Sequence, residues 1–172
     1  GGEKENPNYR EVCSGLTGHT EVVRVVWNNK QIDQSDLLKL FWECHDPTQG
    51  NRQGNDSGSQ YRSAIYTTTQ DQLIKAIDSK NSYQKNLQKN GFGQITTEIK
   101  NNIKFYFAED YHQQYLAKPG SRPYCSAMPT KVEFNDFNGS NFKLNEKIWS
   151  HYNWDVSHCI LRGENTPIKS DS

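Results

Sequence analysis

The chain has no long hydrophobic run, no excess of either charge and no closely spaced pair of cysteines. None of its uninterrupted apolar stretches approaches the roughly 20 residues that cross a bilayer, so the sequence predicts no membrane-spanning helix. Twenty Lys and Arg residues balance 20 Asp and Glu residues, and this neutrality argues against a nucleic-acid-binding protein. Four cysteines without a C-x-x-C motif are typical of buried or redox-active thiols in a reducing compartment.

The first residues are Gly1 and Gly2 in place of a methionine. We therefore expect the natural translation start, and any targeting segment, to lie upstream. The cysteine pattern is then the remaining guide to the compartment, and it favours the cytoplasm. The 172 residues match the usual size of one domain.

Four segments have the composition of β-strands. Residues 20–27 contain four valines and a tryptophan interrupted by single charges, which is typical of a well-buried strand. Residues 62–67 hold a second strand, and residues 95–99 and 103–107 two more short ones.

Two helices are predicted between these strands. Ser35 can cap a helix with leucines at helical spacing, which Pro47 ends. Thr69 and Gln72 form a capping-box pattern that opens a longer helix, which stops at Gly91. This alternation predicts an α+β fold: a two-layer α/β sandwich with helices on one face of a mixed sheet.

Five motifs occur in the order found in one known family. They are YREVCSG at residues 9–15, GHTEVV at 18–23, FWECHDP at 41–47, GNDSGSQYRS at 54–63 and YHQQY at 111–115. In these motifs the chain resembles the peptide methionine sulfoxide reductases of the A class. The resemblance covers residues 1–129 and implies one domain of that type there. It leaves residues 130–172 as an irregular C-terminal extension.

Sulfoxide reduction explains why such a site contains acids and phenols. The sulfur is a poor electrophile until its oxygen is hydrogen-bonded or protonated. The resemblance implies that Glu21 supplies the acid, that Tyr9 and Tyr61 hold the oxygen, and that Asp56 positions a water or a donor near it. A carboxyl at the start of an apolar segment loses hydration, which raises its pKa and retains the proton. A phenol with a pKa of about 10 stays a donor at neutral pH.

Taken singly, these residues have simpler explanations. A glutamate at a strand start is usually solvated, a single tyrosine usually belongs to the core or surface, and Asp56 lies in a glycine-rich turn that its own side chain can stabilise. Their joint match to the family outweighs these readings. His45 is explained equally well as a helix-end cap or as a substrate contact. His112 and Tyr115, three apart, share a helical face and either bind substrate or dock the C-terminal tail.

The cysteines have different expected roles. The resemblance implies that Cys125 is the resolving cysteine, which attacks the sulfenic acid formed on the nucleophile and yields a disulfide. We expect Cys13 and Cys44 to be buried and inert, because no Lys or Arg arrangement beside them lowers a thiol pKa. The family's nucleophilic cysteine lies in a Gly-Cys-Phe-Trp motif, which does not occur in this sequence.

No metal and no other cofactor are expected. His151, His158 and Cys159 are of ligand type, but two of them are adjacent and the third lies seven residues back. This is not the spacing of a zinc site.

The resemblance predicts a peptide-methionine (S)-S-oxide reductase that repairs oxidised methionine in proteins and reduces free methionine sulfoxide. It implies a monomer that uses thioredoxin or another dithiol. Without the nucleophile, these residues alone are expected to be inactive. The start at Gly1 favours a fragment of an active enzyme over a degenerate member that only binds oxidised methionine. A third reading is a thiol-disulfide protein using Cys125 and Cys159, for which a reversible bond between them would be diagnostic.

Overall fold

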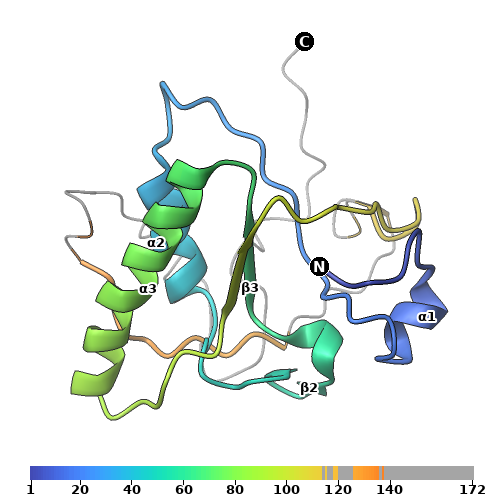
Figure 1. Ribbon diagram of the computed structural model, residues 1–172. Coiled ribbons are helices and arrows are strands. Elements are labelled where there is room, and N and C mark those ends of the chain that lie inside the picture. Colours follow the sequence, from blue (N-terminus) through green and yellow to red (C-terminus); the bar gives the residue numbers. More distant parts are fainter. Residues whose placement is uncertain (114, 116–117, 120–125, 136, 138–172) are drawn as a thin grey trace.

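The computed structural model describes residues 1–113, 115, 118–119, 126–135 and 137. In chain order the elements are α1 (Tyr9–Cys13), α2 (Gln34–Glu43), β1 (Arg52–Gln53), β2 (Asp56–Ser57), the 3-10 helix η1 (Ser59–Tyr61), β3 (Ala64–Thr67), α3 (Gln70–Lys89) and β4 (Glu98–Asn101) (Figure 1). None of the described helices is long and apolar enough to span a membrane.

The strands form two small sheets. β3 and β4 pair in parallel with Ile65 opposite Ile99, and β1 and β2 form an antiparallel hairpin. Helix α3 connects β3 to β4 and packs against both strands. Helix α2 packs against α3. The predicted α+β class is confirmed. The predicted single mixed sheet is wrong for the described residues, because the parallel and antiparallel pairs belong to separate sheets.

Side-chain caps fix where the two long helices begin. Asp33, not Ser35 as predicted, caps α2: its carboxylate accepts from the Ser35 N–H at 2.8 Å. An ionised carboxylate also interacts favourably with the positive end of the helix, which the Ser35 hydroxyl could not do as strongly. The predicted cap of α3 is confirmed, since Thr69 Oγ1 accepts from the Gln72 N–H at 3.2 Å. Gly91, at φ +81°, follows the end of α3.

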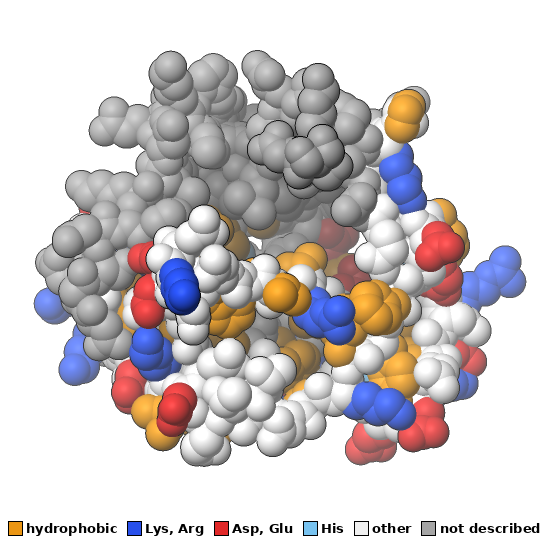
Figure 2. All heavy atoms as spheres, turned by 90° about the horizontal axis from the view of Figure 1, so that it is seen from above, with side chains coloured by type: hydrophobic (Ala, Val, Ile, Leu, Met, Phe, Trp, Pro, Cys, Tyr) orange, Lys and Arg blue, Asp and Glu red, His pale blue; other side chains and the backbone are white. Residues whose placement is uncertain are grey.

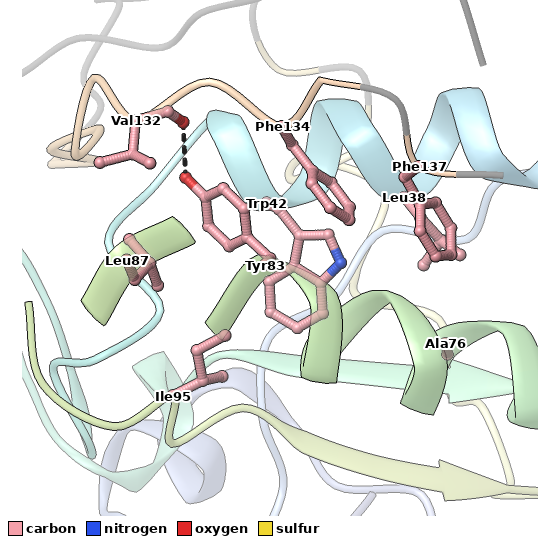
Figure 3. Packing of buried hydrophobic residues seen from close by; sticks show 9 residues of the cluster. All are labelled: Leu38, Trp42, Ala76, Tyr83, Leu87, Ile95, Val132, Phe134 and Phe137. Carbon is pink, nitrogen blue, oxygen red and sulfur yellow. Dashed lines mark hydrogen bonds between the residues drawn. The ribbon is translucent and has the colours of Figure 1, made fainter. Parts of the chain in front are cut away.

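A cluster of aromatic side chains forms the core between α2, α3 and the segment 132–137 (Figure 3). The rings of Trp42 and Tyr83 stack with centroids 5.9 Å apart, and those of Tyr83 and Phe134 lie 5.1 Å apart. The polar atoms of the fully buried rings are paired: Trp42 Nε1 donates to Ser79 Oγ at 2.8 Å, and the Tyr83 hydroxyl donates to the Val132 carbonyl at 2.8 Å. These two rings are therefore buried without leaving an unpaired indole N–H or hydroxyl.

Two of the predicted strands are wrong. Residues 20–27 and 103–107 have no strand pairing in the described part of the chain. Val23 and Val26 are instead 86% and 84% exposed. β-branched residues fit a pleated, half-buried surface, and they form a strand only where a neighbour pairs with the backbone. The strand predicted at 95–99 begins later, as β4 at Glu98.

The face seen from above carries hydrophobic side chains among charged ones (Figure 2). Long apolar segments with unpaired backbone promote association between chains. We expect the double change Val23→Thr and Val26→Thr to reduce light scattering on concentration, because each keeps a β-branched shape and loses an exposed methyl group. The midpoint of thermal unfolding should move by less than about 4 °C, since two surface substitutions together cost within ~1 kcal/mol.

Val132→Thr is the matched control, because Val132 is 8% exposed and belongs to the core. A buried hydroxyl without a partner should cost about 1–3 kcal/mol. If the double surface variant destabilised the chain as much as this control, the two valines would be packed and the exposed surface described here would be wrong.

Candidate active site

Helix α1 positions Tyr9 against His112. Tyr9 is the first residue of α1, and its backbone N–H donates to Glu109 Oε1 at 2.9 Å. The Tyr9 and His112 rings have centroids 4.8 Å apart. A carboxylate at the N-terminus of a helix is also favoured by the helix dipole. These two contacts join α1 to the turn that carries His112. Tyr9 itself is exposed to solvent.

Glu21 is held next to the 3-10 helix η1. Its backbone N–H donates to the Gln60 carbonyl at 2.9 Å, and the Thr20 hydroxyl donates to the same oxygen at 3.0 Å. The Glu21 side chain reaches solvent, yet partial burial of the carboxyl raises its pKa, the His112 charge opposes this rise and the Asp56 charge adds to it. Glu21 therefore keeps its proton to higher pH than a fully hydrated glutamate.

Tyr61 and Tyr9 belong to the same electrostatic cluster as Glu21. Burial raises the pKa of the Tyr61 phenol, and the charges of Glu21 and Asp56 raise it further. A hydrogen bond with the Cys13 side chain is the main cause that raises the pKa of Tyr9, with smaller contributions from Tyr61 and Glu21. Both phenols therefore remain protonated donors at neutral pH. We call Tyr9, Glu21, Asp56, Tyr61 and His112 the candidate site.

Asp56 is fixed by the hairpin of β1 and β2. Ser126 Oγ donates a hydrogen bond to Asp56 Oδ2, and Ser126 is 2% exposed. Gly54 has φ +55°, and a Cβ there would lie 1.8 Å from the Ser126 carbonyl oxygen, so that only glycine fits. Ser126 follows Cys125 in the sequence, and Cys125 itself lies outside the described residues.

His45 and Tyr115 are not brought into the cluster by any contact described. His45 is 6% exposed, and its ring nitrogens lie 2.8 Å from the Phe41 carbonyl oxygen and 2.7 Å from Ser63 Oγ. Of the two roles considered from the sequence, the contact with a carbonyl near the end of α2 corresponds to the helix-end cap. Tyr115 is 45% exposed, and its carbonyl accepts from the Lys118 N–H at 3.1 Å.

Sequence reasoning misplaced Cys13. It was expected to be buried, but its side chain is exposed. Cys13 and Tyr9 are four residues apart and therefore share one face of α1. The i,i+4 spacing in the YREVCSG motif was the signal that could have placed this thiol beside the phenol. Cys44 is half-buried. Its Sγ donates to the Phe41 carbonyl at 3.2 Å.

Gln60 was also missed. It is 6% exposed, and its backbone carbonyl accepts from the Glu21 N–H at 2.9 Å. From sequence alone, its position directly before Tyr61 in the GNDSGSQYRS motif does not indicate that Gln60 is buried or that it contacts Glu21.

Within the described ranges, no group of three or more His, Cys, Asp or Glu side chains could hold a metal ion. His151, His158 and Cys159, whose spacing was considered above, lie outside those ranges.

Residues 1–145 match the sequence model of the family described as "Peptide methionine sulfoxide reductase". The chain belongs to this family. It is 62% identical over 132 residues to the "Mitochondrial peptide methionine sulfoxide reductase" of Bos taurus, a match that covers 77% of this chain and 56% of that protein. It is 61% identical over 132 residues to the "Peptide methionine sulfoxide reductase MsrA" of Pseudomonas entomophila, covering 77% and 59%.

Solved structures of the family have the same fold. "Methionine sulfoxide reductase A of Corynebacterium diphtheriae" superposes with a TM-score of 0.69 at 45% identity, covering 77% of this chain and 66% of that chain. "Mxr1 from Saccharomyces cerevisiae in reduced form" gives a TM-score of 0.63 at 35% identity, covering 74% and 65%. The chain thus spans less than two thirds of these relatives.

Proposed function

We propose that the chain binds methionine S-sulfoxide, free or in proteins, and holds the sulfoxide oxygen with Glu21, Tyr9 and Tyr61. The observation that carries the proposal is that a carboxyl with a raised pKa lies in one cluster with two protonated phenols. A sulfoxide oxygen accepts hydrogen bonds and donates none, so three protonated groups match it. Hydrogen bonds directed at this oxygen increase the electrophilic character of the sulfur, as reduction requires.

The remaining site residues have supporting roles in this proposal. Asp56, anchored by Ser126, orients a water or donor toward the same oxygen. His112, whose ring lies 4.8 Å from that of Tyr9 at a tilt of 39°, and Tyr115 flank the methionine side chain. His45 has no substrate role, because both of its ring nitrogens form internal hydrogen bonds.

The proposed reaction is peptide-methionine (S)-S-oxide reduction. A cysteine thiol attacks the sulfur and takes up the sulfoxide oxygen, which releases the thioether and leaves a sulfenic acid. The Cys125 thiol then displaces water from the sulfenic acid to give a disulfide, which thioredoxin or another dithiol reduces. The reducing partner and a monomeric state in a reducing compartment such as the cytoplasm are part of the proposal.

The 172 residues contain no Gly-Cys-Phe-Trp motif. We propose that this chain alone binds the sulfoxide without reducing it, since groups that bind do not replace a covalent catalyst.

Isothermal titration with an N- and C-blocked methionine S-sulfoxide tests the proposal. The S-sulfoxide should bind and the thioether should not, since the thioether lacks the oxygen. Tyr9→Phe and Tyr61→Phe should each weaken binding about 5- to 10-fold, the value of one neutral hydrogen bond, and the double variant more. Binding should weaken as pH rises through the raised pKa of Glu21, because the carboxylate no longer donates. Glu21→Ala should lose at least as much affinity as Glu21→Gln.

Tyr66→Phe is the control, because the Tyr66 hydroxyl donates to Glu98 Oε1 at 2.5 Å outside the candidate site; it should leave the affinity unchanged. The same samples incubated with dithiothreitol should keep the sulfoxide intact. Equal affinity of the unmodified chain for the sulfoxide and the thioether would refute the binding site. Thiol-dependent turnover would refute the proposed inactivity of the chain alone.

A further inference from the structure

Helix α1 carries Tyr9 but buries none of its own five residues, and it lies apart from α2 and α3 (Figure 1). A helix this short is not stable by itself, since isolated helices of fewer than about 12 residues are marginal in water. Neither burial nor helix length therefore fixes the Tyr9 phenol in place. Its position depends on the contacts of the loop that carries α1, residues 5–16, which we call the α1 loop.

The two ends of the α1 loop are joined by the side chain of His19. Residues 2–4 lead into the loop and residues 17–19 lead out of it. His19 Nδ1 accepts from the Gly2 N–H at 3.1 Å, and His19 Nε2 lies 2.7 Å from the Lys4 carbonyl oxygen. A carbonyl can only accept and a backbone N–H can only donate, so the ring is the neutral tautomer with its proton on Nε2. Both nitrogens of one imidazole thus hold the segment that enters the loop.

The base of the α1 loop is closely packed around this imidazole. His19 is 7% exposed, and its ring lies edge-on to that of Tyr106, with centroids 5.6 Å apart. The Glu3 N–H donates to the Thr17 carbonyl at 3.1 Å. A Cβ at Gly2 would lie 2.3 Å from the Thr17 carbonyl oxygen and 2.4 Å from the His19 backbone nitrogen, so only glycine allows this approach. The base of the loop is therefore buried, although α1 is not.

We propose that His19 is a positioning residue, which closes the α1 loop at its base so that the Tyr9 phenol faces the sulfoxide oxygen. The inference rests on the proposed function. At the other end of the loop, the Tyr9 N–H donates to Glu109 Oε1 at 2.9 Å and the Tyr9 ring contacts that of His112. If the base opened, these two contacts would have to order the whole loop by themselves, and the conformational entropy lost by the loop would oppose this.

The variant His19→Ala tests the proposal, because it removes both hydrogen bonds of the imidazole. The Tyr9 signals in NMR spectra of ring-labelled tyrosine, assigned with Tyr9→Phe, should move toward those of a hydrated tyrosine, since the His112 ring would no longer lie 4.8 Å away. The affinity for the blocked methionine S-sulfoxide should fall by no more than the 5- to 10-fold or so expected for Tyr9→Phe, the value of one neutral hydrogen bond.

A double variant shows whether His19 acts through Tyr9. In a Tyr9→Phe background, His19→Ala should cause no further loss of affinity, because both changes remove the same hydrogen bond to substrate. The pH dependence conferred by Glu21 should stay unchanged, since the Glu21 N–H is held by the Gln60 carbonyl. His19→Gln keeps a donor for the Lys4 carbonyl and should give smaller effects of the same kind.

Matched variants separate positioning from stability. His45 is also buried, at 6% exposed, and has both ring nitrogens bonded, but it lies outside the candidate site. His45→Ala should destabilise the chain at least as much as His19→Ala and leave the Tyr9 signals and the sulfoxide affinity unchanged. Gly2→Ala should force the base of the loop apart and reproduce the effects of His19→Ala. Gly93→Ala should have no effect, because a Cβ there would meet nothing within 4 Å.

The outcomes are distinct. If His19→Ala left the Tyr9 signals in place, or weakened binding further in the Tyr9→Phe background, the positioning role would be refuted and the proposed function would stand. Equal displacement of Tyr9 in His45→Ala would also refute it, since general destabilisation would then be the cause. If the unmodified chain bound no sulfoxide, the proposed function would fail, although the displacement of Tyr9 would still be measurable without substrate. If His19→Ala did not fold, His19→Gln and Gly2→Ala would decide by the same two measurements.

Discussion

Replacing Glu43 by alanine is expected to lower the free energy of unfolding by about 3–5 kcal/mol. Glu43 Oε1 accepts from Lys39 Nζ at 2.7 Å and from the Phe134 N–H at 2.6 Å. Lys39 Nζ also donates to the Phe134 carbonyl at 2.6 Å. The ion pair, with side chains 7% and 13% exposed, thus satisfies both backbone groups of a core residue. Glu43→Ala leaves a buried charge and a buried N–H without partners, and each is costly.

Urea unfolding followed by tryptophan fluorescence measures this loss. Glu43→Gln should cost less than Glu43→Ala, because its amide oxygen still accepts from the Phe134 N–H. Lys75→Ala is the matched control: it breaks a 3.5 Å ion pair with Asp33 whose side chains are 41% and 61% exposed, and exposed pairs contribute about 0–1 kcal/mol. Similar losses for Glu43→Ala and Lys75→Ala would mean that Lys39 and Glu43 are hydrated and that segment 132–137 is not held by them.

The contacts of Lys39 and Glu43 with Phe134 also show that the sequence could not predict the packing of the C-terminal segment on the core. Residues 130–172 have few periodic apolar positions and were predicted to be an irregular extension. Val132, Phe134 and Phe137 nevertheless belong to the core, and the domain boundary after residue 129 stays a prediction. Their burial depends on partners about 90 residues away in the sequence, as in the bond from Phe134 to Glu43. Local periodicity carries no information on such contacts.

The helices were predictable because their signals are local. Thr69 caps the start of α3 by a hydrogen bond to a residue three positions on, and Gly91 follows its end with a positive φ. Strands were wrongly predicted at 20–27 and 103–107, because a strand depends on a partner that can lie anywhere in the chain. In the described structure, Arg24 lies over the rings of Phe105 and Phe107, 5.5 and 4.9 Å from their centroids. These two segments therefore contact each other through side chains without a backbone ladder.

The candidate site was predicted by family resemblance rather than by physical patterns. Glu21, Tyr9 and Tyr61 lie up to 52 positions apart in the sequence, and nothing in their spacing indicates that they cluster. The structure brings them together through the Gln60 carbonyl and the contacts of α1. Their catalytic roles stay predictions, as do those of Asp56, His112, Tyr115 and Cys125.

Lowering the pH from 6.5 to about 4 is expected to remove about 3 kcal/mol of stability through His45 alone. Burial lowers the pKa of His45 from its ordinary value of 6.5 to about 4, although the Phe41 carbonyl and Asp46 act to raise it. A carbonyl can only accept, so Nδ1 donates to Phe41 and Nε2 accepts from the Ser63 hydroxyl in the neutral ring. Ser63 Oγ in turn lies 2.8 Å from Thr97 Oγ1, so a proton on Nε2 would require these hydroxyls to reorient.

The free energy of unfolding depends on pH wherever the folded and unfolded states bind different numbers of protons. Above pH 6.5 the imidazole is neutral in both states and contributes no pH dependence. Between pH 6.5 and about 4 the unfolded chain binds a proton that the folded chain does not, so the free energy of unfolding falls as pH falls, by about 1.4 kcal/mol per pH unit. Below this window both states are protonated and the loss is complete. Carboxylates that titrate near pH 4 add to the slope, and comparison with a variant removes their contribution.

His45→Gln provides that comparison, because its amide offers one donor and one acceptor but does not titrate. The variant should be less stable at pH 7, since the longer side chain cannot reproduce both short contacts. Its free energy of unfolding, measured by urea denaturation at half-unit steps from pH 7.5 to 4, should fall less steeply than that of the unmodified chain below pH 6.5. The two curves should converge by about 3 kcal/mol across the window. Curves that stayed parallel would mean that His45 is protonated in the folded chain, which is incompatible with the buried, neutral imidazole that joins α2 to the strand region at Ser63.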